Sequence, residues 1–329
     1  MKNSCLRILG AEHPGTLSAM GNLACMYSNQ GLWKEAEELG LQVMDGRIKV
    51  FGAEHPDTLL AMGNLAGTYR NQGRWQEAEE LELQVKDSCL RILGAEHPGT
   101  LLAMGNLACT YSNQGLWKEA EELGLQVMDG RIKVLGAEHP DTLLAMGNLA
   151  GTYRNQGRWQ EAEELELQVK DSCLRILGAE HPGTLSVMGN LACTYGNQGL
   201  WKEAEELELQ VMDGRIKAFG AEHPDTLLAM GNLASTYSNQ GRWQEAEELE
   251  LQVTDGRFKV LGAEHPDTLS AMRNLACIYS NQGRRKEAEG LELQVKDACL
   301  RMHGAEHPVT LSTMEHIAMV TQSRPLEGA

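Results

Sequence analysis

The sequence has no long hydrophobic run, no paired cysteine motif and no block of basic residues. No stretch approaches 18 consecutive apolar residues, and the N-terminus lacks the apolar segment and cleavage site of a signal peptide. We therefore expect a soluble, cytoplasmic protein that does not bind membranes. The 46 acidic residues outnumber the 29 basic residues and give a net charge of -17. A surface that follows the phosphates of a nucleic acid is not expected from this balance.

The motifs of common catalytic and nucleotide-binding sites are absent as well. The sequence contains no GxxxxGK[ST], GxSxG or HExxH pattern and no EF-hand loop. Most of the eight cysteines recur at intervals of 84 residues, and none forms a CxxC pair. Cysteines separated by whole repeats indicate free thiols in a reducing compartment rather than disulfides or metal ligands. We expect a noncatalytic protein with no metal and no cofactor.

The sequence does contain one motif at a fixed period. Ala-Glu-His-Pro begins at residues 11, 53, 95, 137, 179, 221, 263 and 305, which is a period of 42. A unit of this length holds two helices and their turns, and it can bury its apolar faces only by stacking on its neighbours. The period predicts an all-α fold, a right-handed α-solenoid of helix-turn-helix repeats. We expect one continuous array over 1–329, composed of a partial helix (1–10), seven full repeats (11–304) and a degenerate capping half-repeat (305–329).

The second repeat, copy 2 (residues 53–94), shows the pattern of a single unit. Helix A is predicted to begin near Pro56, where proline presets the backbone for a first helical turn, and to run for about 16 residues. The sequence Asn71-Gln72-Gly73 supplies its stop. Helix B is predicted from about Trp75 to Leu93, with Gly94 as its C-terminal cap. The inner face of helix A comprises Leu59, Met62, Ala66 and Tyr69.

Three other features of the repeat have a structural interpretation. The glutamates of helix B are interpreted as a solvated face rather than as paired catalytic carboxylates. One histidine before the same proline in every repeat indicates loop packing between units rather than a metal site. Gly40 and Gly46, inside helix B of copy 1, are each expected to cost about 1 kcal/mol relative to alanine in an exposed helix. The glutamates of copy 2 are Glu77, Glu79, Glu80 and Glu82.

The repeat resembles a known family. Its pattern is Asn64-Leu65-Ala66, Tyr69, Asn71-Gln72-Gly73, Trp75, Glu77-Ala78-Glu79-Glu80-Leu81 and Leu93-Gly94-Ala95-Glu96-His97-Pro98. This pattern resembles the tetratricopeptide repeats of kinesin light chains, and it is more similar to the repeat arrays at the C-terminal ends of fungal NB-ARC and NACHT receptor proteins. The position of Glu82 is usually aromatic in kinesin light chains, whereas Glu or Gly occupies it here, which favours the fungal receptors.

The resemblance implies a function. It implies a protein-interaction scaffold without catalytic activity that binds a peptide or protein partner, as the ligand-sensing repeat region of a fungal NLR-like receptor or a remnant of one. The alternative is a cargo adaptor of the kinesin-light-chain type. Because residues 1–10 match the end of a helix B without a preceding helix A, we also expect either an upstream domain or an uncapped end that can associate with another copy.

Differences between copies fall on a second stripe of helix A, displaced from the core stripe, while the core positions stay fixed. Copies 2 and 4 are identical, which indicates that the unit of duplication was a pair. In tetratricopeptide arrays the A helices line the concave groove that holds the ligand, so the resemblance places this stripe in the groove. Arg70, Arg154 and Arg273 are read as isolated positive charges and predict a partner with acidic and apolar groups. The predicted partner-binding residues are Leu60, Asn64, Gly67, Arg70, Leu102, Asn106, Cys109, Leu144, Asn148, Arg154, Asn190, Leu228, Asn232 and Arg273.

Overall fold

The protein is described by a computed structural model, which places residues 9–304 and Met314. These described residues form fourteen α-helices, α2 to α15, and contain no strand. The predicted fold class, an all-α solenoid of helix-turn-helix repeats, is confirmed. The chain divides into two compact units, Met1–Leu165 (unit 1) and Glu166–Ala329 (unit 2). The predicted terminal pieces, 1–10 and 305–329, lie almost entirely outside the described residues.

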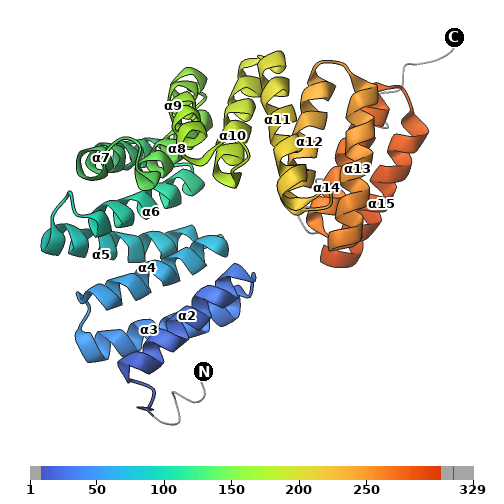
Figure 1. The fold of residues 1–329 in the computed structure, drawn as a ribbon. Helices are drawn as coiled ribbons and strands as arrows, with labels where there is room; N and C mark the ends of the chain where they lie inside the picture. The colour runs from blue at the N-terminus through green and yellow to red at the C-terminus, as the bar shows by residue number, and fades with distance from the viewer. Residues whose placement is uncertain (1–8, 305–313, 315–329) are drawn as a thin grey trace. The chain divides into compact units, whose positions relative to one another are not determined.

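Unit 1 contains the A and B helices of the first three copies and helix A of the fourth. Within it each helix packs against the next one along the chain, and the A helices α2 and α4 also touch, as do α6 and α8 (Figure 1). The helices are α2 (Pro14–Asn29), α3 (Trp33–Phe51), α4 (Pro56–Asn71), α5 (Trp75–Leu93), α6 (Pro98–Gln114), α7 (Trp117–Leu135) and α8 (Pro140–Asn155). The unit boundary falls within α9 (Trp159–Leu177).

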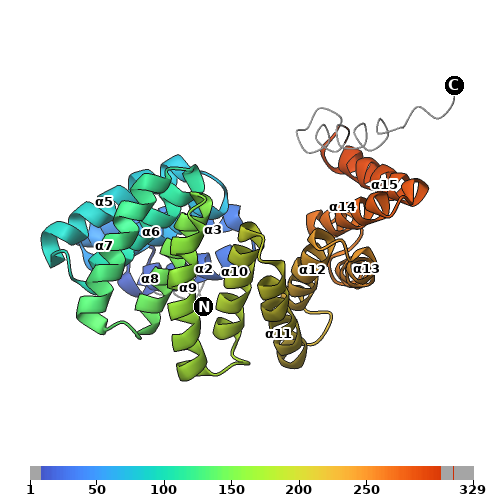
Figure 2. The same cartoon turned by 90° about the horizontal axis from the view of Figure 1, so that it is seen from above.

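Unit 2 continues the same alternation of A and B helices. Helix α11 packs against α10 and α12, and α13 to α15 follow in sequence (Figure 2). The helices are α10 (Pro182–Gln198), α11 (Trp201–Phe219), α12 (Pro224–Asn239), α13 (Trp243–Leu261), α14 (Pro266–Asn281) and α15 (Arg285–His303). No helix among the described residues is both long and apolar enough to cross a membrane.

The histidine of the repeated motif starts each A helix. The Nδ1 atom of His55 accepts a hydrogen bond from the backbone N–H of Asp57 at 3.1 Å, while Pro56 occupies the first helical turn. The same side-chain cap is formed in all seven copies. A capping acceptor satisfies one of the four N–H groups that a helix N-terminus leaves without a partner. The histidines therefore have a more specific role than the loop packing predicted for them.

The hydrophobic core is shared between copies. Leu59 and Met62 of α4 pack with Val85 and Cys89 of α5, and Ala103 of α6 in the next copy completes the cluster. No copy can bury this surface alone, which is the physical reason for the stacking that the 42-residue period predicts. The predicted bounds of both helices of copy 2 are confirmed.

Two glycines in α3 have a role that the sequence analysis did not anticipate. A Cβ atom at Gly46 would lie 2.6 Å from Cδ2 of Leu17, and one at Gly40 would lie 3.0 Å from Cδ1 of Leu65. Gly46 is buried. The expectation of a simple helix penalty is wrong at Gly46, because the missing side chain lets α3 approach Leu17 closely, and at Gly40 a close contact with Leu65 opposes the gain in helix propensity.

Candidate functional site

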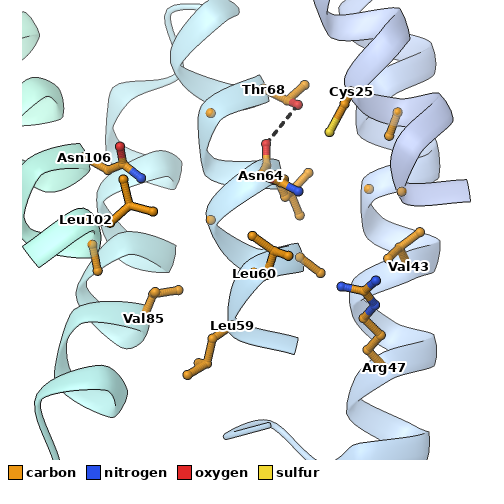
Figure 3. A pocket seen from close by; sticks show the side chains of 18 of the residues that line it. Cys25, Val43, Arg47, Leu59, Leu60, Asn64, Thr68, Val85, Leu102 and Asn106 are labelled. Carbon is orange, nitrogen blue, oxygen red and sulfur yellow. Dashed lines mark hydrogen bonds between the residues drawn. The ribbon is translucent and has the colours of Figure 1, made fainter. Parts of the chain in front are cut away.

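Unit 1 contains a groove with a volume of about 650 Å³. Its lining comes from the A helices α2, α4 and α6 and from the inner faces of the B helices α3 and α5 (Figure 3). A volume of this size lies within the range of roughly 300 to 1,000 Å³ that is typical of ligand pockets. Six of the predicted partner-binding residues line it, namely Leu60, Asn64, Gly67, Arg70, Leu102 and Asn106.

The other predicted residues are not part of this groove. Cys109, Leu144, Asn148 and Arg154 belong to unit 1 but do not line the groove, although Asn148 Nδ2 lies 3.8 Å from Cys109 Sγ. The remaining four predicted residues, all in unit 2, are Asn190, Leu228, Asn232 and Arg273. The structure thus brings together four predicted residues of copy 2 and two of copy 3.

Two leucines form the apolar part of the groove surface. Leu60 of α4 is 56% exposed and Leu102 of α6, one repeat later, is 52% exposed. Both side chains project from their helices into the groove (Figure 3). Large exposed apolar side chains at equivalent positions of adjacent copies are available to cover apolar groups of a partner.

Two asparagines lie beside these leucines. Asn64 is exposed and Asn106 is half-buried, and no hydrogen bond within the described part of the chain engages either side-chain amide. The backbone carbonyl of Asn64 accepts a hydrogen bond from the Thr68 hydroxyl at 3.2 Å (Figure 3). Each amide side chain offers both donors and an acceptor, the two functions that a peptide backbone requires.

Arg70 lies on the groove as predicted, but its charge is not isolated. Its Nη1 atom donates to the backbone carbonyl of Asn106 at 3.3 Å, and its Nε atom lies 3.5 Å from Oε1 of Glu82. The arginine side chain is only 22% exposed. Arg70 therefore links two neighbouring copies and neutralises a buried carboxylate, which leaves less of its charge for a partner.

The interpretation of Glu82 as part of a solvated face is wrong. Its side chain is 2% exposed, and Oε2 accepts a hydrogen bond from the Thr110 hydroxyl at 2.5 Å. Burial raises the pKa of Glu82, against the opposing effects of Thr110 and Arg70. Glu82 stands four residues after Ala78, which is fully buried, so the two share one face of α5. That spacing is the signal that could have revealed its burial.

Arg47 is a groove residue that the sequence analysis missed. It lies on α3, is 9% exposed, and its Nη1 atom donates to the backbone carbonyl of Asp57 at 2.5 Å. The predicted binding stripe lies on helix A alone, whereas Arg47 comes from helix B. Its position four residues after the buried Val43 was the available signal.

The fixed charge of the groove is positive although the chain is strongly acidic. The charged residues that line it are Arg47, Arg70 and Glu54. Glu54 forms an ion pair with Arg91, and hydrogen bonding from this guanidinium lowers the pKa of the Glu54 carboxyl. A groove with this balance favours a partner that supplies negative charge or hydrogen-bond acceptors.

The groove has no arrangement typical of a metal centre. Within the described residues, no group of three or more His, Cys, Asp or Glu side chains is placed to hold a metal ion. The seven described cysteines are free thiols, and Cys25 at the groove surface is exposed. The chemistry available in the groove is apolar contact, amide hydrogen bonding and guanidinium charge.

Family models and solved structures place this architecture among known repeats. Two models described as tetratricopeptide repeat match the chain, one at residues 57–133, 110–172 and 141–217 and the other at 16–57, 226–267 and 268–309. A search of curated proteins found no match.

Solved structures with similar repeats come from several organisms. A protein of Podosopora anserina, described as a kinesin light chain with nearly identical TPR-like repeats, is 38% identical, with a TM-score of 0.57, and the match covers 63% of this chain and 99% of that one. BtubC from P. vanneervenii is 18% identical, with a TM-score of 0.56, covering 76% of this chain and 94% of that one. A STAND protein with a tetratricopeptide repeat sensor from Pyrococcus horikoshii is 14% identical, with a TM-score of 0.62, covering 93% and 44%. The last two similarities concern the fold alone.

Proposed function

Because this chain belongs to the tetratricopeptide repeat family, we propose that it is a noncatalytic interaction scaffold that binds an extended peptide or a protein segment in the groove of unit 1. The observation that carries the proposal is that two exposed leucines and two asparagines line the same groove. These residues are Leu60, Leu102, Asn64 and Asn106.

The groove residues support binding of an extended chain. Leu60 and Leu102 are one repeat apart and provide two apolar contacts, while Asn64 and Asn106 provide hydrogen bonds that do not depend on the partner's side chains. All four side chains stand on packed helices, so the backbone of the groove loses little conformational entropy when a partner binds. Affinity then comes from apolar burial and backbone hydrogen bonds together.

We further propose that the array is the ligand-sensing repeat region of a fungal NLR-like receptor, or a remnant of one, in the cytoplasm. Three observations support this: the resemblance of the repeat to those of fungal receptors, the 38% identity to a fungal protein, and a similar fold in the repeat sensor of a STAND protein. The alternative is a cargo adaptor, which the kinesin light chain name of the fungal protein favours. The sequence encoded upstream in the gene distinguishes them, since a receptor requires an NB-ARC or NACHT domain and an adaptor a coiled coil.

Peptide binding is tested with a phage-displayed peptide library selected on the full chain. The strongest binder is titrated against the groove variant Leu60→Glu with Leu102→Glu. Two buried apolar contacts are lost, so the dissociation constant should rise at least tenfold, which is about 1.4 kcal/mol.

A matched control uses the same change at two exposed positions outside the groove, Leu90→Glu with Ile132→Glu. These residues are 45% and 38% exposed and lie on α5 and α7. The control should bind with unchanged affinity. Loss of binding in this control but not in the groove variant would show that the partner occupies another surface.

A further inference from the structure

Four copies hold an arginine side chain over the tyrosine near the end of helix A. In copy 2 the Arg74 guanidinium lies 4.3 Å from the centre of the Tyr69 ring. It also forms ion pairs with Glu37 of copy 1 and with Glu77 of its own copy. A tyrosine ring and two carboxylates thus form a receptor for one guanidinium. The same arrangement recurs in copies 4, 6 and 7, where the arginines are Arg158, Arg242 and Arg284.

Copy 3 has the same receptor without an arginine. Tyr111, Glu79 and Glu119 take the positions of the tyrosine and the two glutamates, and together they are called the copy 3 site. Leu116, which has no side-chain donor, stands where copy 2 has its arginine. Gln114 donates to Glu79 at 2.9 Å, the distance of the equivalent bond in copy 2. The carboxylate of the preceding copy is therefore held in the same way in both places.

The charges around Tyr111 show that both carboxylates of the copy 3 site lie near its ring. Burial raises the pKa of the Tyr111 hydroxyl, and the charges of Glu79 and Glu119 raise it further. At Tyr69 the charge of the arginine opposes the effects of burial and of the carboxylates. Within the described chain, Glu119 has no hydrogen bond or ion pair, and Glu79 has only the bond from the glutamine. The Tyr111 ring is half-buried, whereas Tyr69 is 8% exposed.

The chemistry of the copy 3 site matches an arginine side chain. In copy 2 a single guanidinium bonds to both glutamates, so their equivalents Glu79 and Glu119 lie within reach of one cation. A guanidinium can place its face on an aromatic ring while its edge donates to carboxylates, and an ammonium cannot do both. The four occupied copies show that this combination of groups selects arginine in this fold.

We infer that the copy 3 site binds an arginine side chain of a basic partner, with the guanidinium over the Tyr111 ring and bonded to Glu79 and Glu119. None of these three residues lines the groove of unit 1, so the copy 3 site is a second site, separate from the one in the proposed function. The net charge of -17 favours the approach of a basic segment to this surface.

The test titrates N-acetylarginine methylamide into the full chain labelled with ¹³C-tyrosine, at constant ionic strength. The ring signals of Tyr111, assigned with Tyr111→Phe, should shift and saturate. Those of Tyr69 and Tyr153 should stay in place, because an arginine of the chain already covers each ring. N-acetylcitrulline methylamide has a similar shape without the charge, and it should leave Tyr111 unshifted.

Two double substitutions separate the carboxylates of the site from the general charge of the chain. Glu79→Gln with Glu119→Gln should raise the dissociation constant of the arginine compound at least about fivefold, because two ion pairs are lost. Glu80→Gln with Glu122→Gln removes the same charge from exposed positions of the same two helices, and it should leave this constant unchanged.

A third variant fills the copy 3 site from within the chain. Leu116→Arg installs the residue that copy 2 carries, so the arginine compound should no longer shift Tyr111.

Four results would each overturn the inference. They are no shift of Tyr111 in the unchanged chain, an equal shift with the citrulline compound, unchanged affinity after Glu79→Gln with Glu119→Gln, and a shift that persists in Leu116→Arg. None of them bears on the proposed function, which is tested separately through Leu60 and Leu102.

Discussion

Neighbouring copies in unit 1 are joined by two junctions with different chemistry. At the junction between copies 1 and 2, Arg74 forms an ion pair near the surface with Glu37. At the junction between copies 2 and 3, the carboxylate of Glu82 is buried. The apolar core is similar in both. The difference shows that the alternation between odd and even copies governs how the copies stack, in addition to what the groove presents.

The first junction is an arginine clamp, formed by Tyr69, Gln72 and Arg74 of copy 2 with Glu37 of copy 1. The Arg74 guanidinium lies 4.3 Å from the centre of the Tyr69 ring, and its Nη1 atom lies 2.7 Å from Oε1 of Glu37. Gln72 donates to the other oxygen of Glu37 at 2.9 Å. Burial tends to raise the pKa of Glu37, but the hydrogen bonds from Arg74 and Gln72 outweigh it and lower this pKa.

The second junction keeps the glutamine contact, since Gln114 donates to Glu79 at 2.9 Å, but it lacks the arginine of the clamp. Leu116 of copy 3 takes the place of Arg74, and the buried Glu82 accepts the Thr110 hydroxyl and neutralises Arg70. At the first junction, Gly40 occupies the position of Glu82, and the facing hydroxyl of Thr68 donates to its own helix instead. In unit 1 the residue identities at these positions therefore vary together, whereas in unit 2 the buried Glu208 and Glu250 occur together with the clamp arginines Arg242 and Arg284.

Unit 2 has buried glutamates without an arginine in the place of Arg70. Gly196 and Ser238 stand at that position in copies 5 and 6. Burial raises the pKa of Glu208 to about 7, although Thr236 opposes the shift. Burial likewise raises the pKa of Glu250 to about 7, against the effects of Asn274 and Arg257.

The largest effect expected from this difference is a pH dependence of unit 2. A buried carboxyl with a pKa near 7 keeps its proton in the folded chain at pH values where the unfolded chain, with its ordinary pKa of 4.5, has released it. The stability that this group contributes is therefore fully present below about pH 4.5 and is lost as the pH rises to about 7. Each of Glu208 and Glu250 should contribute about 3 kcal/mol to this loss. Hydrogen exchange in α11 to α14, corrected for the intrinsic effect of pH, should show weaker protection at pH 8 than at pH 5.

The matched variant for this prediction is Glu208→Gln with Glu250→Gln. A carboxamide cannot ionise, so the variant should lose most of the pH dependence and should be more protected than the unchanged chain at pH 8. Equal protection of the unchanged chain at both pH values would contradict the prediction.

The next effect concerns the arginine of the second junction. Arg70→Ser leaves Glu82 buried without an arginine at position 70, as Glu208 is with Gly196 and Glu250 with Ser238 in unit 2. We expect a loss of about 2 to 3 kcal/mol at pH 8, somewhat below the value for a fully buried pair because Arg70 is partly exposed. Urea denaturation at pH 8 measures the change, and the loss should be smaller at pH 5, where Glu82 can take up a proton.

A double substitution sharpens this prediction. Arg70→Ser with Glu82→Gly reproduces the residues found at the first junction. The combined loss should be at least about 1 kcal/mol smaller than the sum of the two single losses, because residues in one ion pair are coupled. Additive losses would mean that Arg70 and Glu82 act independently.

A smaller effect is expected from the clamp. Arg74→Leu installs the residue that copy 3 carries at this position, and it removes the contacts with Glu37 and Tyr69. The side chain of Arg74 is 35% exposed, so we expect a loss of about 1 kcal/mol in urea denaturation. Lys49→Leu is the control, since its single pair with Glu12 at 3.6 Å is well exposed and should contribute nothing measurable. A loss as large as that of Arg70→Ser would invert the ranking of the two junctions.

The smallest effect is expected at Gly40. Alanine gains about 1 kcal/mol in helix propensity, but its Cβ would lie 3.0 Å from Leu65 Cδ1, which is tighter than an ordinary contact. The two contributions should nearly cancel, and the free energy of unfolding should change by less than about 0.5 kcal/mol. Stabilisation by the full helix propensity, measured in the same urea titrations, would show that Leu65 moves aside without cost.

The sequence by itself determined the repeating unit and the bounds of its helices. The Ala-Glu-His-Pro period, the proline after His55 and the glycine at position 94 are local signals, and local signals act within one copy. The helix A stripe of Leu60 and Asn64 could be predicted to lie on a groove because the two residues share one face of a helix and the resemblance assigns that face.

Only the tertiary structure decided which side chains of helix B are covered and what they pair with. Glu82 accepts a hydrogen bond from Thr110 of the next copy, and Arg70 donates to the Asn106 carbonyl of that copy; these groups stand 28 and 36 residues away in the chain. Arg47 lines the groove beside α4 of the next copy, where the Asp57 carbonyl accepts its hydrogen bond. Burial and pairing depend on how the copies stack. The residue pattern within one copy does not specify which groups of the next copy lie against it.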